Sequence, residues 1–177
     1  PLVAALCEQL DHLPLAIELA AGHLRGLSLP VLLARLTNRL DLLRGGARDL
    51  PERQQTMRAA IAWSYNLLPP SEQRAFRMLG IFAGGCTLAA LERVGWKSAR
   101  PASADSLSVI NTLVNASLVQ METKEAERMP RYRMLEVIRE YALEQLQIMG
   151  EEERYRRRHA AYYAALAEEA ERGGPGQ

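Results

Sequence analysis

Residues 105–134 read DSLSVINTLVNASLVQMETKEAERMPRYRM, and within them the apolar pattern changes from helical to alternating. Asp105 suits the N-cap of a helix whose apolar residues recur every three or four positions. These residues are Leu107, Ile110, Leu113 and Val114. Two alternating runs follow, with inward-facing residues at Val119 and Met121 and then at Tyr132 and Met134. The segment therefore predicts a helix followed by a two-stranded hairpin.

Two further helices are predicted before this segment. The first begins at Ser71 and the second at Thr87, because hydroxyl side chains cap helix N-termini. Their inward residues are Ala75, Phe76 and Leu79 in the first helix and Leu88, Leu91 and Val94 in the second. A loop over residues 82–86 separates the two. Three helices followed by a hairpin is the element order of a winged helix, so we predict a winged-helix domain over residues 69–150.

Two helices are predicted after the hairpin. The first ends at Gly150, and its apolar face comprises Leu135, Ile138, Ala142 and Leu146. The second begins near Glu152, and its apolar face comprises Tyr155, Tyr162, Tyr163 and Leu166. We predict that residues 151–177 begin a helical sensor or repeat region.

The N-terminal part reads as short helices separated by proline and glycine. The helix after the break at Pro14 presents one apolar face, formed by Leu13, Ile17, Ala20, Ala21 and Leu24. The helix that begins at Ser28 presents Leu32, Leu33, Leu36, Leu40 and Leu43. A last one presents Met57, Ile61, Tyr65 and Leu68. Pro69-Pro70 ends it, so we predict a helical domain over residues 1–68.

The composition of the 177 residues indicates a mainly α fold. There are 28 Leu and 26 Ala but only 7 Val and 6 Ile, and strands prefer β-branched side chains. The architecture predicted is a helical bundle, then a winged helix with a small hairpin, then a C-terminal helix. A net charge of +1 excludes a nucleic-acid binder whose affinity comes from bulk positive charge.

The sequence also indicates the cellular compartment. It holds no run of about 18 apolar residues, so we expect no membrane span. The start Pro1-Leu2-Val3 is unlike a signal peptide, and we expect the chain to be a piece of a longer polypeptide. Cys7 and Cys86 are far apart and predict buried thiols in a reducing cytosol. We therefore expect a cytoplasmic protein.

The usual catalytic motifs are missing from the sequence. It contains no phosphate-binding loop of the form G-x-x-x-x-G-K-[ST] and no G-x-S-x-G nucleophile motif. The histidines at 12, 23 and 159 are scattered, so we predict no metal site. Glu136 and Glu140 lie one helical turn apart, but Arg139 between them favours a solvated charged face over a catalytic pair. We predict no catalytic residue.

The predicted third helix of the winged helix is unsuited to DNA. Residues 101–123 contain no Lys or Arg, although phosphate anchoring supplies most non-specific DNA affinity. The hairpin carries four basic residues, Lys124, Arg128, Arg131 and Arg133, which are offset by Glu122, Glu125 and Glu127. A protein-facing role is therefore favoured, and direct DNA binding stays the alternative.

Several segments resemble one family of proteins. HLPLAIELAA (residues 12–21) is similar to the G-L-P-L-A motif of the NB-ARC, or STAND, class of signalling ATPases. Three later segments resemble the stretches that lie C-terminal to that motif in the family: LPERQQTMRAAIAWSYNLL (50–68), FRMLGIFAGGCTL (76–88) and YRMLEVIREYALEQL (132–146). The resemblance covers almost the whole chain in the right order. It is greatest to the bacterial AfsR-like and LuxR-type transcriptional regulators.

The resemblance implies a role in nucleotide-dependent switching. In the family, ATP or ADP with Mg²⁺ lies between a phosphate-loop domain, which this sequence lacks, and helical and winged-helix domains. The family proline packs on the adenine, and its equivalent is Pro14, flanked by Leu13 and Leu15. The implied partners are an ATPase domain of the same polypeptide and a C-terminal helical-repeat sensor region. DNA binding is expected only through domains outside this chain, and the chain alone is expected to bind no cofactor and to have no ATPase activity.

The sequence departs from the family in two places. The glycine before Leu-Pro-Leu-Ala is His12, and the Met-His-Asp triplet corresponds to Met134-Leu135-Glu136. The family histidine touches the β-phosphate of ADP, which Leu135 has no hydrogen-bonding group to do. Arg133 is a candidate replacement. The resemblance predicts that the chain couples nucleotide state to domain arrangement in a transcriptional regulator. The alternatives are a DNA-binding winged helix and a protein-interaction scaffold without a nucleotide.

Overall fold

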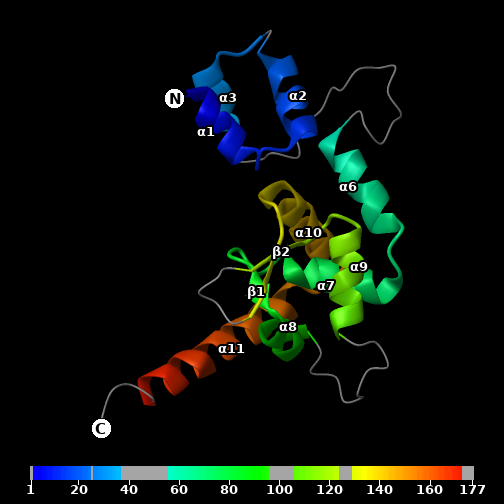
Figure 1. The fold of residues 1–177 in the computed structure, drawn as a ribbon, viewed down its shortest axis with the longest axis vertical. Coiled ribbons are helices and arrows are strands. Elements are labelled where there is room, and N and C mark those ends of the chain that lie inside the picture. Colours follow the sequence, from blue (N-terminus) through cyan, green and yellow to red (C-terminus); the bar gives the residue numbers. More distant parts are fainter. Residues whose placement is uncertain (1, 25, 37–55, 96–105, 124–128, 173–177) are drawn as a thin grey trace.

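The computed structural model describes residues 2–24, 26–36, 56–95, 106–123 and 129–172. Within these residues the chain is mainly helical with one small antiparallel sheet, which confirms the predicted fold class (Figure 1). The first described helices are α1 (Leu2–Gln9), α2 (Pro14–His23), α3 (Leu29–Arg35) and α6 (Met57–Asn66). The next elements are α7 (Pro70–Leu79), β1 (Cys86–Thr87), α8 (Leu88–Gly95) and α9 (Ser106–Asn115). The last are β2 (Gln120–Glu122), β3 (Arg131–Arg133), α10 (Glu136–Ile148) and α11 (Glu152–Arg172).

The N-terminal helices α1, α2 and α3 lie together at one end of the molecule, and α2 contacts α6 (Figure 1). The buried face of α2 consists of Ala16, Leu19 and Ala20, whereas Ala21 and Leu24 are exposed. The apolar face predicted for this helix is therefore wrong in part. Because α2 is apolar on nearly every side, its sequence does not fix the inward face, and packing against neighbouring helices selects it. Leu40 and Leu43 lie outside the described residues.

Helices α7, α8 and α9 and the three strands form a winged helix. The strand order is β1-β3-β2, and Tyr132 in the central strand pairs with both Cys86 and Met121. The sequence predicted only the two strands of the hairpin and missed β1, because a strand of two residues is too short to show an alternating pattern. Thr87 still caps α8 as predicted, since its Oγ1 accepts a hydrogen bond from the Ala90 N–H at 3.3 Å.

The sheet buries only part of the apolar set predicted for it. Tyr132 and Met134 are buried as expected, and so is Val119, but Met121 is 56% exposed. Val119 precedes β2, and its N–H donates to the carbonyl oxygen of Leu113 at the end of α9. Val119 therefore belongs to the turn after α9, so the alternation of β2 does not run on from it.

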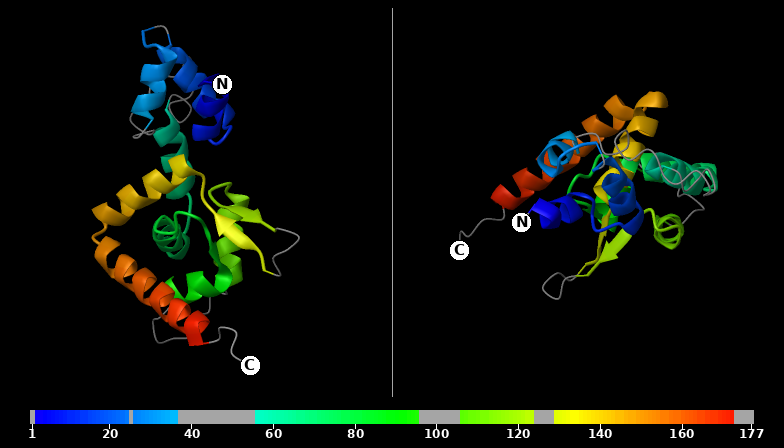
Figure 2. Two further views of the ribbon diagram at one scale, coloured as in Figure 1. Left: turned by 90° about the vertical axis from the view of Figure 1, so that its left-hand side faces the viewer. Right: turned by 90° about the horizontal axis from the view of Figure 1, so that it is seen from above.

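Helix α6 packs against both the N-terminal helices and the winged helix. Its Tyr65 ring lies 5.2 Å from the ring of Phe76 in α7 and 5.8 Å from that of Tyr141 in α10. Arg58 donates two hydrogen bonds to the Glu144 carboxylate of α10, at 2.5 and 2.9 Å. Figure 2 shows α6 between the two parts of the fold. The domain boundary at residues 68–69 stays a prediction.

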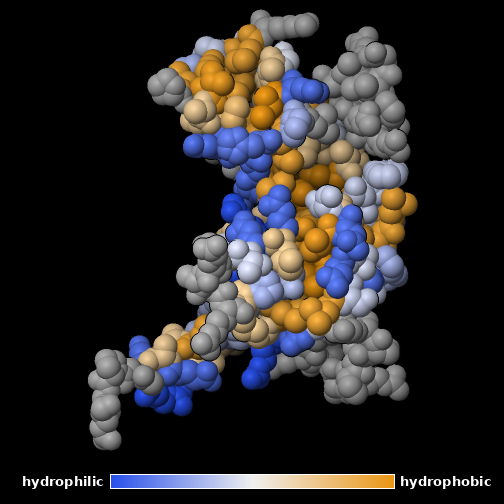
Figure 3. Space-filling model, in the orientation of Figure 1, coloured by the Kyte–Doolittle hydropathy of each residue, from blue (hydrophilic) through white to orange (hydrophobic). Residues whose placement is uncertain are grey.

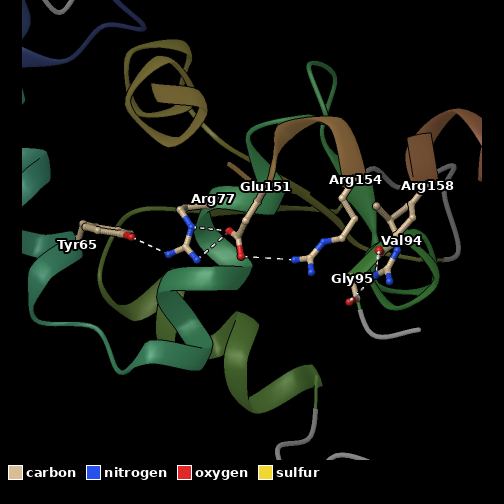
Figure 4. A network of polar contacts seen from close by, with 7 residues as sticks. All are labelled: Tyr65, Arg77, Val94, Gly95, Glu151, Arg154 and Arg158. Atoms are coloured by element: carbon tan, nitrogen blue, oxygen red, sulfur yellow. Dashed lines mark hydrogen bonds and ion pairs between the residues drawn. The ribbon is translucent and has the colours of Figure 1, made fainter. Parts of the chain in front are cut away.

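Two arginines fix α11 on the winged helix (Figure 4). The buried Arg77 of α7 donates to Glu151, which immediately precedes α11, at 2.8 Å. Arg158 of α11 donates to the carbonyl oxygens of Val94 and Gly95 at the end of α8, at 3.4 and 3.5 Å. The N-terminal half of α11 is therefore bound to the domain, and its C-terminal half is exposed.

The two cysteines are free thiols with different surroundings. Cys86 is buried, as predicted, and burial raises the pKa of its thiol to about 12. Cys7 is half-buried. Among the helices that the structure describes, none is both long and apolar enough to span a bilayer.

Candidate functional site

Two of the segments that carry the family resemblance meet in the fold, those around residues 12–21 and 132–146. The turn between α1 and α2 lies against the start of α10, although 125 residues separate them in sequence. The contact is a hydrogen bond of 2.8 Å, in which the backbone N–H of Glu136 donates to Oδ2 of Asp11. The residues predicted for adenine contact and those predicted for nucleotide sensing therefore belong to adjoining segments.

A tight turn positions the first segment. At the end of α1 the His12 N–H donates to the Cys7 carbonyl oxygen at 2.9 Å, and the Asp11 N–H donates to that of Glu8 at 3.0 Å. This pair of bonds is a Schellman motif, which requires a left-handed residue directly after the helix. Asp11 has φ 52° and His12 has φ 55°. Two consecutive residues therefore take the left-handed conformation.

The predicted adenine-binding residues follow this turn. Leu13 is the N-cap residue of α2 and packs partly buried against the core. Pro14 is the first residue of α2, where its missing N–H costs no hydrogen bond, and its ring is exposed. Leu15 lies in α2, and its side chain is outside the described part of the chain. Pro14 thus presents a rigid apolar surface three residues after Asp11.

The second segment joins β3 to α10. Met134 is buried and Leu135, the N-cap residue of α10, is half-buried against the core. Arg133 is exposed, and its guanidinium lies 3.5 Å from the Glu122 carboxylate. Leu135 offers no polar atom from its side chain, so the role predicted for the family histidine has no equivalent at that position.

The Glu136 carboxylate holds the start of α10 in place. It accepts two hydrogen bonds from Arg139, at 2.9 and 2.5 Å, and Arg139 also donates to the Gly80 carbonyl oxygen at the end of α7, at 3.2 Å. The hydrogen bonding with Glu136 raises the pKa of Arg139 and supports the interpretation of Glu136 as part of a charged helix face. The polar contacts therefore run from Asp11 through the start of α10 to α7.

Sequence reasoning missed Asp11. The available signal was an aspartate just after a short helix, where residues that tolerate positive φ are enriched. That signal indicates a helix end, but it does not indicate a partner far along the chain.

The conformation of His12 leads to a stability prediction. Glycine adopts positive φ without a steric penalty, whereas a residue with a Cβ pays for it, so His12→Gly should raise the free energy of unfolding by about 0.5–1 kcal/mol. Urea unfolding measures this change. Ser108→Gly, at an exposed position inside α9, should lower stability by a similar amount. A shift of both variants in the same direction would contradict the strain at His12.

The exposed surface of α9 is uncharged. Its exposed side chains are Leu107, Ser108, Asn111 and Asn115. Arg131 at the sheet donates to the carbonyl oxygens of Gly84 and Gly85, each at 3.2 Å. Lys124 and Arg128 lie outside the described residues. The described part of the winged helix therefore presents few cations for DNA phosphates.

Comparison with known proteins agrees with the regulator part of the resemblance. The chain is 42% identical over 168 residues to a Mycobacterium tuberculosis protein named as an HTH-type transcriptional regulator, covering 93% of this chain and 18% of that protein. It is 35% identical over 137 residues to the regulatory protein AfsR of Streptomyces coelicolor, covering 73% of this chain and 12% of AfsR. The chain is homologous to bacterial transcriptional regulators.

The chain spans less than a fifth of the length of those two relatives. It is also 36% identical over 149 residues to an uncharacterized protein of Mycobacterium bovis, covering 84% of this chain and 37% of that protein. No protein-family model matches the chain, and no solved structure matches it. The class of ATPase to which the sequence points stays a prediction.

Proposed function

We propose that this chain is the part of a bacterial transcriptional regulator that converts ADP or ATP binding into a change of domain arrangement. The observation that carries the proposal is the contact between the segment after α1 and the start of α10. A ligand that touches Pro14 in the first segment and the exposed Arg133 beside the second would favour one arrangement of the N-terminal helices and the winged helix over another. The chain itself would have no ATPase activity, and the phosphate loop and Mg²⁺-binding groups would belong to another domain of the polypeptide.

The described residues fit the adenine better than the phosphates. Pro14 offers an exposed ring beside the half-buried Leu13, which suits a flat aromatic base. At the start of α10, however, the Leu135 side chain has no donor and the Asp11 carboxylate already accepts the Glu136 N–H. A phosphate would be repelled by that carboxylate, so we assign residues 134–136 no phosphate contact.

Exposed apolar side chains at two places support the proposal that an ATPase domain and a helical sensor region of the same polypeptide pack on this chain. On the N-terminal helices these are Leu2, Val3, Leu24 and Val31, and Figure 3 shows hydrophobic surface over this end of the molecule. We propose that the ATPase domain covers it. At the opposite end, a groove of about 380 Å³ lies between α8 and α11 and includes Ala89, Tyr162 and Leu166. We propose that a helical sensor region packs there.

The adenine contact can be tested in the full-length regulator by calorimetry with ADP. Pro14→Ala should weaken ADP binding about tenfold, because a rigid apolar contact with the base is lost. Pro30→Ala is the matched control, since Pro30 is also exposed in the first turn of a helix, α3. Equal ADP affinity in both variants would favour the alternative of a protein-interaction scaffold without a nucleotide.

The same titration tests Arg133. Its contact with Glu122 is exposed on both sides, so the guanidinium is accessible to a phosphate. If Arg133→Ala leaves ADP affinity unchanged, Arg133 does not replace the family histidine.

Direct DNA binding by this winged helix is the second candidate, because a relative is named as an HTH-type regulator. We propose instead that DNA is bound by other domains of a cytoplasmic protein. A salt-dependent gel shift of duplex DNA that is lost on Asn111→Glu in α9 would favour the alternative.

A further inference from the structure

We propose that Asp11 holds the N-terminal helices against the winged helix without a nucleotide, by capping α10. We call its hydrogen bond with the Glu136 N–H the Asp11 cap. The bond itself does not depend on the proposed nucleotide switch, whereas its use as a regulatory contact rests on that proposed function.

Helix α10 has no cap of its own. Its first N–H groups have no acceptor within the helix, and its N-cap residue, Leu135, makes no side-chain capping bond. Aspartate is among the best N-cap residues, and its negative charge also interacts favourably with the helix dipole. Asp11 supplies both from a different part of the fold.

The backbone around Asp11 is set to deliver this side chain. Asp11 and His12 both have positive φ, an arrangement that costs free energy in residues other than glycine. The Schellman bonds at the end of α1 fix the turn, and the Asp11 carboxylate leaves it toward α10. Glycine, the usual residue at this position of the motif, would relieve the backbone but make no cap.

The cap lies at the segment where the resemblance predicts a nucleotide clamp. Leu135 has no hydrogen-bonding group for that clamp, and the next residue, Glu136, is held by Asp11. From Glu136 the contacts continue through Arg139 to Gly80 of α7. A bond within the protein therefore stands in place of a bond to the ligand. We call the arrangement in which the Asp11 cap is formed the closed arrangement. It should persist in nucleotide-free protein.

The test uses full-length, nucleotide-free regulator with spin labels on cysteines at Ala21 of α2 and Gln147 of α10, both exposed, and with Cys7 replaced by serine. Asp11→Ala should lower the equilibrium ratio of closed to open protein about tenfold, as expected for loss of an N-cap. The distribution of distances between the two labels should therefore move to longer values. Hydrogen exchange of the Glu136 amide should rise by a similar factor. Glu8→Ala, which removes a carboxylate from the exposed face of α1, should change neither measurement.

Asp11→Gly tests whether the effect of Asp11→Ala comes from misfolding, because glycine relieves the left-handed backbone while removing the cap. This variant should open the protein but still show a cooperative thermal unfolding transition. Unchanged label separation and unchanged Glu136 exchange in both Asp11 variants would overturn the proposal. The result is separable from the ADP titration. If Asp11→Ala opens the protein but Pro14→Ala binds ADP with normal affinity, the proposal of the Asp11 cap is supported and the proposed adenine contact is rejected.

Discussion

Replacing Arg77 with alanine should lower the free energy of unfolding by about 3 kcal/mol, because it leaves the buried Tyr65 hydroxyl without this partner and leaves the part-buried Glu151 carboxylate with the longer 3.4 Å contact to Arg154. Arg77 is 5% exposed. Its Nε donates to Glu151 at 2.8 Å and its Nη1 donates to the Tyr65 hydroxyl at 2.8 Å (Figure 4). One side chain thus joins α6, α7 and the segment before α11. Urea unfolding followed by circular dichroism measures the loss.

The matched control for Arg77 is another arginine paired with a glutamate. Arg157 pairs with Glu153 at 2.7 Å, but both side chains are about four-fifths exposed, at 78% and 80%. Water and salt screen such a pair, so Arg157→Ala should change stability by less than about 0.5 kcal/mol. Similar losses in the two variants would show that burial does not strengthen the Arg77 contacts.

Gly85→Ala should lower the free energy of unfolding by about 2–4 kcal/mol. Gly85 has φ 74°, and a Cβ there would lie 2.7 Å from the Tyr132 carbonyl oxygen of β3. Both the backbone conformation and the contact with a rigid strand disfavour any side chain. The same unfolding measurement applies, and exchange of the Cys86 amide should increase if β1 separates from β3.

The adjacent glycine provides the control for this substitution. A Cβ on Gly84 would meet nothing within 4 Å. Gly84→Ala should therefore stay within about 0.5 kcal/mol of the parent protein. A comparable loss at Gly84 would mean that alanine disturbs the loop itself and not the approach of β3.

The helices were predictable from their apolar period, but not every predicted cap is correct: α7 begins at Pro70, and Ser71 donates to the Glu72 carboxylate and does not cap the helix. Thr87 caps α8, and Tyr132 and Met134 are buried, as the sequence predicts. Prediction failed where the local signal was short or symmetric. Strand β1 has two residues and no period, and α2 is apolar around its circumference. In both cases partners distant in sequence determine the outcome.

The candidate site was predictable only as two separate segments. The resemblance singled out Pro14 and residues 133–136, but no periodicity indicates that they adjoin. Asp11 was missed because its role depends on positive φ and on a partner 125 residues away. Local patterns report on neighbours within a few turns, so a cap supplied from another unit leaves no trace in them.

The two-point attachment of α11, through Glu151 and Arg158, has a mechanical consequence. A helix of 21 residues is about 30 Å long at 1.5 Å per residue. Because its base turns together with α7 and α8, a rotation of about 10° would displace its far tip by roughly 5 Å, which is the pitch of one helical turn. A small rotation of α7 and α8 would thereby be magnified into a shift of about one helical turn for any segment that packs on that tip.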